Sequence, residues 1–399
     1  MKEGDKLSHD LKIYTENIEP IAQNQIYTLI STPAFEGARV RIMPDVHAGT
    51  GCVVGFTSTP TDRVIPNVIG VDIGCGMLTV KLGQIDLDAV ALDNFINESI
   101  PAGSSLRKNF GDVDFIRELI CYGELRELDR IYRSLGTLGG GNHFIEIDRD
   151  DSGEYYLVIH TGSRNLGLQV AKLYQQKAVS ECKGASDKAK AEAHDYLMAR
   201  GRAADIPDEL ARISALGAKR TKTPADFCYF EGEECKAYLH DMRICQDFAK
   251  RNRRKIADDI LKFLGIFRAE SFETVHNFID DDGMIRKGAI PSHKGQTVLI
   301  PMNMRDGCLI AEGKGNEEWN FSAPHGAGRL VSRGEAKELF SLEEYQSEMR
   351  GIYTTSANMS TIDESPMAYK NADEIRMLIE PTVTVKNIIK PIYNFKASK

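Results

Sequence analysis

The side chains best suited to binding a metal stand in tight turns that are spread from residue 72 to residue 325. Five segments carry them: VGVDIGCGM with Asp72 and Cys75, GGGNHFIEI with Asn142 and His143, VIHTGSRN with His160, TVHNFI with His276 and Asn277, and APHGAGR with His325. Glycine in most of these turns lets the backbone approach a ligand closely. The side chains can meet only if strands far apart in the chain join one core, so we expect one compact domain.

The five segments supply one thiolate, one carboxylate and three imidazoles, with a fourth imidazole to spare. A soft thiolate beside a hard carboxylate suits a divalent transition metal better than magnesium or calcium. Cys75 can bridge two ions, and Asp72 can complete one of them. The fourth imidazole, His325, stands in an HGAG turn whose backbone N–H groups a phosphate can approach. We therefore expect His325 to meet an anion or to carry a covalent phosphate.

Each segment has a plainer interpretation when it is taken alone. Cys75 can be a small buried hydrophobic residue at the end of a strand, and His276 can be a core histidine between apolar neighbours. His143 can lie satisfied at a loop-to-strand junction, and His160 can lie in a solvent-facing turn. HGAGR can open a helix that Ser332 caps. The recurrence of similar residues in similar turns favours the shared site.

Hydrophobic periodicity predicts two strand-rich blocks around a helical region. We expect strands in residues 38–82 (including VIPNVIGVDIG), in HFIEIDRD and EYYLVIHTGS, across 272–330 and in the tail PTVTVKNIIKPIYNF; we expect helices in 86–135 (including DFIRELICYGELRELDRIYRSL) and in SRGEAKELFSL. Residues 168–264 are typical of charged helices that form an insertion or a flanking layer. The predicted fold class is α+β: a single compact catalytic domain over residues 1–399, with a mixed β core and a flanking helical layer.

The strand period of two gives the segment after Asn142 two faces. His143 and Ile145 belong to one face, and Phe144 and Glu146 to the other, provided that the strand starts late or twists strongly. Asn142 and Glu146 would then flank a ligand, where they can hold a phosphate and the edge of a base.

Composition limits the class of protein. Hydrophobic residues make up 42% of the chain, enough for a large core, but no apolar run approaches the length of a membrane span. The polar start MKEGDKLSHDLKIY lacks a secretory signal, and none of the eight cysteines forms a C-x-x-C pair, so we expect a cytoplasmic protein without a disulfide framework or zinc knuckle. A net charge of −8 argues against a protein that coats nucleic acid.

The remaining polar candidates fall into three groups. His47 and Asp45 in MPDVHAGTG are candidates to touch substrate. Arg164 after His160, and Arg329 and Arg333 after His325, are candidate phosphate ligands, the last two as bidentate donors. His9, His194, His240 and His293 stand in polar or helical stretches and are expected to be exposed, and RNRRK (251–255) reads as a solvated helix face.

Taken in order, these motifs closely resemble those of the RtcB family of RNA-splicing ligases. The resemblance runs through MPDVHAGTG, VGVDIGCGM, GTLGGGNHFIEI, HTGSRNLG, HN at 276–277, RKGA (286–289), GNEE (316–319), HGAGR and DESPMAYK (363–370). VGVDIGCGM, GNHFIE and HGAGR together are highly specific. The first 35 residues and the charged helical region match least.

The resemblance implies a ligase that depends on GTP and two Mn²⁺ ions. It would join RNA ending in a 2′,3′-cyclic phosphate or 3′-phosphate to RNA with a 5′-hydroxyl, in RNA repair or tRNA splicing, and we expect a monomer that touches no membrane. By motif position, Cys75 bridges the ions, His160 and His276 complete one, and Asp72 and His143 complete the other. His325 is the catalytic nucleophile that takes GMP. The other nucleotide-binding positions implied are Asn142, His143, Phe144, Glu146, His276, Asn277, Pro301, Asn303, Met304, Cys308, Gly326, Ala327, Gly328, Tyr369 and Lys396.

One segment departs from the family pattern. Many relatives carry a PGSMG-type loop that touches nucleotide phosphate, where this chain has Pro301-Met-Asn-Met-Arg-Asp306. Asn303 can still donate a hydrogen bond and Arg305 can add charge. We expect GTP use or substrate range to differ from those of the relatives.

Two rival functions stay open at this point. The first is a metal-dependent cyclic phosphodiesterase, phosphoesterase or nucleotide-capping enzyme acting on 3′-phosphate ends, and the presence of His325, Glu146 and Tyr369 counts against it. The second is a non-catalytic RNA-binding or chaperone-like relative, and the complete set of metal ligands counts against that.

Overall fold

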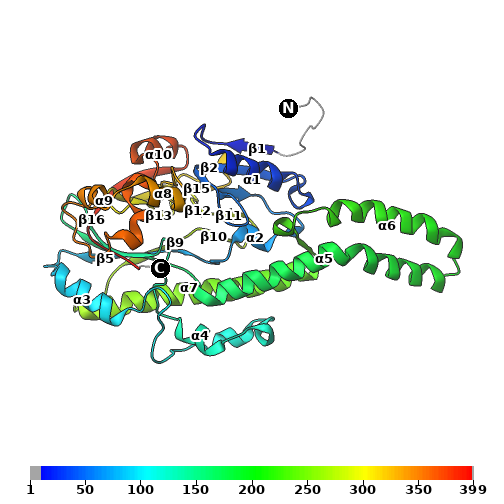
Figure 1. The fold of residues 1–399 in the computed structure, drawn as a ribbon, viewed down its shortest axis with the longest axis horizontal. Coiled ribbons are helices and arrows are strands. Elements are labelled where there is room, and N and C mark those ends of the chain that lie inside the picture. Colours follow the sequence, from blue (N-terminus) through cyan, green and yellow to red (C-terminus); the bar gives the residue numbers. More distant parts are fainter. Residues whose placement is uncertain (1–9, 398–399) are drawn as a thin grey trace.

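The computed structural model describes residues 10–397 as an α+β fold built on two larger sheets (Figure 1). The seven-stranded sheet has the order β13 (Thr297–Asn303), β14 (Gly307–Gly313), β16 (Val383–Lys396), β6 (Phe144–Arg149), β7 (Tyr155–Thr161), β5 (Gly76–Gly83) and β9 (Ser271–Val275). The five-stranded sheet has the order β1 (Asp10–Ile13), β2 (Arg39–His47), β3 (Val54–Ser58), β11 (Ile285–Lys287) and β10 (Asn277–Ile279). Two small sheets pair β12 (Ala289–Pro291) with β15 (Ser322–Pro324), and β4 (Arg63–Val64) with β8 (Phe230–Glu231).

Strands from the two ends of the chain pair with each other in both larger sheets. β5 pairs with β9 so that Gly76 lies opposite Val275, and β3 pairs with β11. A Cβ on Gly76 would lie 2.6 Å from the carbonyl oxygen of Thr274, so the strands approach this closely only with glycine there. The first and last strand blocks therefore share their sheets, which the predicted site requires.

Ten helices of the described chain surround the sheets. They are α1 (Pro20–Ile30), α2 (Pro66–Ile69), α3 (Ala89–Ser99), α4 (Leu128–Arg133), α5 (Arg164–Ala199), α6 (Ile206–Thr221), α7 (Glu233–Phe263), α8 (Arg333–Leu339), α9 (Leu342–Glu348) and α10 (Ala372–Leu378). The long α7 packs under β5 and β7, while α5 and α6 form a hairpin that projects from the body (Figure 1). Apolar residues recur on one face of α7, and Ile256 and Ile260 are fully buried against the seven-stranded sheet.

The strand and helix predictions hold for most of the chain, and two need correction. VIPNVIGVDIG is not a strand: Pro66 starts the short helix α2, because proline suits the first helical position. DFIRELICYGELRELDRIYRSL is broken into two short 3₁₀ segments and α4. The Asp241 carboxylate accepts the backbone N–H groups of Ile120 and Cys121, so tertiary hydrogen bonds replace helical ones there.

Several smaller expectations are also answered. Ser332 caps α8 and forms a capping box with Glu335. His194, His240 and His293 are exposed, whereas His9 lies outside the described residues. All eight cysteines are buried free thiols. Among the described helices, none combines the length and the apolar character needed to cross a membrane.

Candidate metal centre and adjoining pocket

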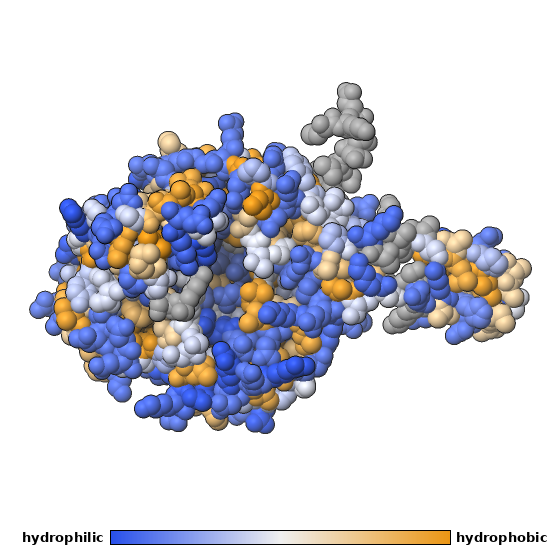
Figure 2. Space-filling model, viewed as in Figure 1, coloured by the Kyte–Doolittle hydropathy of each residue, from blue (hydrophilic) through white to orange (hydrophobic). Residues whose placement is uncertain are grey.

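The predicted metal ligands come from the ends of strands and meet in two groups. Figure 2 shows a hollow near the middle of this face of the molecule. Asp72 and Cys75 stand in the turn between α2 and β5, and His143 directly precedes β6. His160 lies near the end of β7, and His276 lies between β9 and β10. The backbone N–H of His276 donates to the carbonyl oxygen of Cys75 at 3.0 Å, because the pairing of β5 with β9 continues into the ligand turns.

The five side chains form two groups of three that share one sulfur atom. Cys75, His160 and His276 make one group, and Asp72, Cys75 and His143 make the other, with the ligand atoms of each group within 4.8 Å of one another. Cys75 Sγ lies 3.3 Å from His160 Nε2 and 3.5 Å from His143 Nε2. These are the two groups that the family resemblance implies.

Backbone hydrogen bonds aim the imidazoles at the shared sulfur. His143 Nδ1 lies 3.0 Å from the carbonyl oxygen of Leu138, and His160 Nδ1 lies 3.1 Å from that of Asn142. Because a carbonyl oxygen can only accept a hydrogen bond, both rings donate from Nδ1–H and direct Nε2 towards the other ligands. Nε2 of neutral His160 is then a lone pair, whereas Nε2 of His143 lies 2.9 Å from Asp72 Oδ2. His160 Nε2 and His276 Nε2 face each other at 3.4 Å. Lone pairs that converge in this way fit a cation.

Burial keeps the His160 and His276 rings neutral, which is the protonation state that a cation needs. Burial lowers the pKa of His160 and of His276 well below the ordinary value, so both rings are neutral. Burial alone would raise the pKa of Asp72, but the hydrogen bond from His143 lowers it overall. Burial and the charge of Asp72 raise the pKa of the Cys75 thiol, which a bound cation would reverse by displacing the proton.

Two side chains of α7 hold the turns that carry these ligands. Arg253 donates from Nη1 to the carbonyl oxygens of Gly74 and Thr161, each at 2.9 Å. Asn252 accepts the backbone N–H groups of Gly136 and Thr137 and donates to the carbonyl oxygen of Gly162. The interpretation of RNRRK as a solvated face is therefore wrong for these two residues, which are buried.

His325 lies beside the group of Cys75, His160 and His276 and is held by Asp45. His325 Nδ1 is 2.6 Å from Asp45 Oδ2, which also accepts the His325 backbone N–H at 3.1 Å. The ring centroids of His276 and His325 are 4.9 Å apart. Asp45 is fully buried, and a carboxylate would repel phosphate, so we withdraw it from the predicted phosphate contacts. It fixes the His325 ring with Nε2 free.

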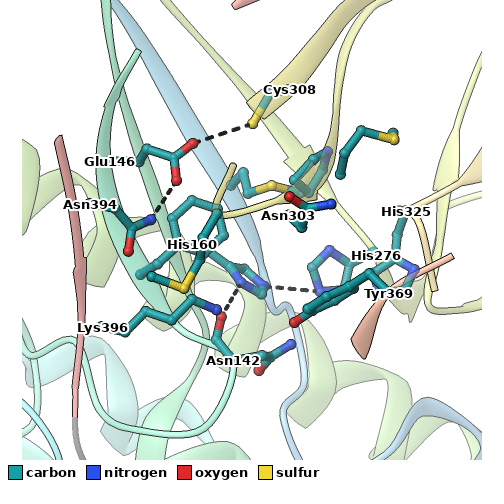
Figure 3. Close-up of a pocket in the computed structure, with 15 residues that line it drawn as sticks. Asn142, Glu146, His160, His276, Asn303, Cys308, His325, Tyr369, Asn394 and Lys396 are labelled. Atoms are coloured by element: carbon teal, nitrogen blue, oxygen red, sulfur yellow. Dashed lines mark hydrogen bonds between the residues drawn. The ribbon is translucent and has the colours of Figure 1, made fainter. Parts of the chain in front are cut away.

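A pocket opens from His325 to Glu146 and gathers most of the predicted nucleotide-binding residues (Figure 3). The predicted residues in its lining are Asn142, Phe144, Glu146, His276, Pro301, Asn303, Met304, Cys308, His325, Tyr369 and Lys396. Asn142, Phe144 and Glu146 alternate along one face because β6 starts at Phe144, late enough for the predicted pattern. The sequence reasoning missed Met77, Met302 and Asn394, which also line the pocket. Only the strand periodicity of β5, β13 and β16 could have indicated them.

The remaining predicted nucleotide residues lie around this lining. Asn277 accepts the Gly288 backbone N–H at 2.9 Å and so ties the ligand turn to its neighbour. Gly326, Ala327 and Gly328 follow His325 in a turn packed on the backbone of Asp45. A Cβ on Gly328, which has φ +74°, would lie 2.2 Å from the Asp45 carbonyl oxygen. Glycine is required there for packing.

The departing segment Pro301–Asp306 forms the turn between β13 and β14. Asn303 Oδ1 accepts the backbone N–H groups of Arg305 and Asp306, each at 2.9 Å, and Asn303 Nδ2 donates to Asp306. Arg305 pairs with Asp306 and Glu348. The expected free charge of Arg305 is thus already neutralised, and the turn closes on itself.

A buried carboxylate that the motif analysis did not single out organises the other wall of the pocket. Glu364 Oε2 accepts from Tyr369 Oη at 2.7 Å and from Lys396 Nζ at 2.5 Å. Arg333 pairs with Glu364 and Asp363, and Arg329 lies 3.7 Å from Glu364. Burial would raise the pKa of Glu364, but Lys396 and the two arginines lower it to about 2. Arg333 is therefore committed to carboxylates, which weakens its prediction as a phosphate ligand. Arg329 donates to the backbone carbonyl oxygens of Val331 and Asp363, and its Nη1 has no hydrogen-bond partner among the described residues.

Arg164 keeps a free donor near the metal ligands, whereas the single N–H of the neutral His47 ring already donates to the backbone of Asp45. Arg164 Nη1 lies 3.2 Å from His143 Nδ1, and its buried Nε has no hydrogen-bond partner among the described residues. A Cβ on Gly139 would lie 1.8 Å from this guanidinium, so glycine makes its place. His47 Nδ1 lies 2.9 Å from the Asp45 carbonyl oxygen, and burial lowers the pKa of His47 to about 4.

An α+β fold in which two ligand groups share one thiol, beside a pocket with a carboxylate-held histidine, defines a metal-dependent enzyme. A family model described as "tRNA-splicing ligase RtcB" matches residues 25–122 and 122–397. The chain therefore belongs to the RtcB family.

Curated relatives match along nearly the same length. The RNA-splicing ligase RtcB of Escherichia coli (strain K12) is 28% identical over 95% of this chain and 96% of its own. The tRNA-splicing ligase RtcB of Aeropyrum pernix is 26% identical over 84% of this chain and 82% of its own. That of Thermococcus kodakarensis is 24% identical over 85% and 83%.

Proposed function

We propose that this protein is an RNA ligase that uses GTP and two Mn²⁺ ions. It joins RNA ending in a 2′,3′-cyclic phosphate or 3′-phosphate to RNA with a 5′-hydroxyl, through a histidine–GMP intermediate. The observation that carries the proposal is the placement of His325, locked by Asp45 and 4.9 Å from the ring of His276, within the metal-ligand cluster. The relatives are named RNA-splicing and tRNA-splicing ligases, which supports RNA ligation as the class of reaction.

Cys75 would bridge the two ions, with His160 and His276 on one and Asp72 and His143 on the other. The mixture of thiolate, imidazole and carboxylate suits Mn²⁺ and also suits zinc, which often outcompetes it. The ions would supply positive charge for the phosphoryl oxygens and activate water on a cyclic phosphate.

His325 supplies the nucleophile. Asp45 accepts a hydrogen bond from Nδ1–H of His325. The lone pair of Nε2 is therefore directed away from Asp45 and is free to attack the α-phosphorus of GTP. The nitrogen–phosphorus bond forms as pyrophosphate leaves. The RNA 3′-phosphate then takes GMP from His325, and the 5′-hydroxyl oxygen displaces GMP to form the new phosphodiester. Each step needs positioning and neutralised charge more than acid–base strength.

The pocket walls would hold the nucleotide and the RNA ends. Glu146 offers acceptor oxygens to a base edge, Lys396 offers a cation from the strand paired with β6, and Tyr369 offers a ring across the pocket. Arg164 and Arg329 each retain a donor for RNA phosphate, whereas Arg333 binds Glu364 and Asp363 first. Buried free thiols fit a reducing compartment, so the proposal keeps a cytoplasmic monomer.

The test is transfer of label from α-labelled GTP to protein in the presence of Mn²⁺. We expect acid-labile label on the wild-type protein and none on His325→Ala. A His194→Ala variant, which changes an exposed histidine, is the matched control and keeps full labelling. Wild-type protein that takes no label but opens cyclic phosphates would instead support the phosphodiesterase.

A further inference from the structure

Glu146 lines the pocket (Figure 3) and lies next to a second buried carboxyl group, that of Asp148. Glu146 and Asp148 stand two residues apart on β6, so both side chains project from one face of the strand. Both are buried, and Asp148 is 0% exposed. Three atoms lie within 4.8 Å of one another: a carboxylate oxygen of Glu146, a carboxylate oxygen of Asp148 and Cys308 Sγ.

The hydrogen bonds around this pair indicate that Asp148 donates a hydrogen bond to Glu146. Asn394 Nδ2 donates to Glu146 Oε2 at 2.5 Å, and Cys308 Sγ lies 4.0 Å from Glu146 Oε1. No N–H or O–H group of the described residues donates to either oxygen of Asp148. Lys396, the lysine of this pocket, is bonded to Glu364 instead. Two buried carboxylates in contact cannot both be charged, so one carries a proton and donates it to the other.

The proton belongs on Asp148. Burial and the adjacent Glu146 raise the pKa of Asp148 well above its ordinary range. Burial also raises the pKa of Glu146, but hydrogen bonds from Asp148 and Asn394 and the charge of Lys396 oppose that rise. Glu146 thus receives two donors from the protein interior, and its remaining lone pairs face the pocket as acceptors.

We infer that Asp148 is a positioning residue that sets the nucleobase preference of the pocket, by holding Glu146 as a hydrogen-bond acceptor towards the base. This inference rests on the proposed nucleotide site. Guanine presents N1–H and its exocyclic amine on one edge, and both donate to such a carboxylate. Adenine presents an unprotonated N1 at the same place, so two acceptors would meet without a proton between them. Asp148 never touches the base in this arrangement.

The experiment compares base preference across variants of Asp148 in the full chain with Mn²⁺. Displacement of a fluorescent GTP analogue by the α,β-methylene analogues of GTP and ATP gives two affinities without nucleotide transfer. We expect Asp148→Val to lower the GTP-to-ATP affinity ratio about tenfold or more, because Glu146 loses its donor and becomes free to take a proton. Asp148→Asn keeps the shape and an N–H donor, so it should retain the wild-type ratio. Asp148→Ala serves if the valine variant does not fold.

The possible outcomes separate this inference from the proposal beneath it. A wild type that prefers GTP, with the same ratio in Asp148→Val or Asp148→Ala, overturns the role of Asp148 and leaves the ligase proposal standing. A wild type that binds neither nucleotide overturns both. Metal analysis covers the remaining possibility: loss of one bound ion in Asp148→Val with an unchanged ratio would make Glu146, Asp148 and Cys308 a cation site instead.

Discussion

The two ends of the pocket are built in different ways. At the metal end, each ligand belongs to a short motif, and the carbonyl oxygens of Leu138 and Asn142 orient His143 and His160. At the base end, Glu146 depends on Asn394, which lies 248 residues away in the sequence. The residues of the metal end can therefore be identified from short sequence motifs. At the base end Glu146 belongs to a motif, but its partners Asn394 and Asp148 do not, and strand pairing brings Asn394 to it.

Two buried cysteines, one at each end, give the sharpest test of this contrast. Cys75→Ser removes the shared thiolate, so we expect bound metal to fall and ligation to drop by more than about a hundredfold. Cys308→Ser should leave the metal content unchanged, because Cys308 belongs to neither of the two groups of metal ligands. Metal analysis of the purified variants and ligation assays measure both effects. Equal ligation by the wild type with Mg²⁺ and Mn²⁺ would contradict a bridging thiolate.

The link between Asp45 and His325 predicts the next largest effect. Asp45→Asn removes the charge that holds the Nδ1 proton of His325, so we expect GTP-dependent labelling to slow on the order of 10²-fold or more. Metal content should stay the same, because Asp45 is not a metal ligand in either group. Labelling rates over time, combined with metal analysis, separate the two roles. A variant that labels at the wild-type rate would show that Asp45 does not position His325.

Neighbouring arginines on α7 test whether the helix holds the metal end in place. Arg253→Met leaves the carbonyl oxygens of Gly74 and Thr161 without their donor, so we expect metal affinity to weaken about tenfold. Arg254→Met changes an exposed residue of the same type and should have little effect. Titration of metal into the stripped proteins measures the difference. Matching affinities in the two variants would reduce Arg253 to a packing residue.

The buried Glu364 predicts a smaller effect, a loss of folding stability as the pH falls into the acid range. Its pKa is about 2 in the folded chain against 4.5 as the ordinary value, so its contribution to stability is present above about 4.5 and is lost as the pH falls towards 2. The contribution is on the order of 3 kcal/mol. Glu364→Gln should flatten this acid dependence. Denaturant unfolding from pH 6 to pH 3 gives the slope, and an unchanged slope would contradict the lowered pKa.

The sequence alone was enough to predict that Asp72, Cys75, His143, His160 and His276 come together, because each stands in a short, recognisable segment. The same was true of the longer helices and strands, such as α7 and β16, whose periodicity is set by burial of one face. It misjudged VIPNVIGVDIG and residues 114–135, where proline geometry and the Asp241 carboxylate override the hydrophobic pattern.

Only the tertiary structure decided which charges are free. Asp45, Arg305 and Arg333 all looked available in the sequence, yet each is bonded to a partner that the chain brings from elsewhere. Asn252, Arg253 and Asp148 looked ordinary, yet they are buried beneath the site. A residue type fixes which bonds are possible, but burial and pairing across the sheets fix which of them form.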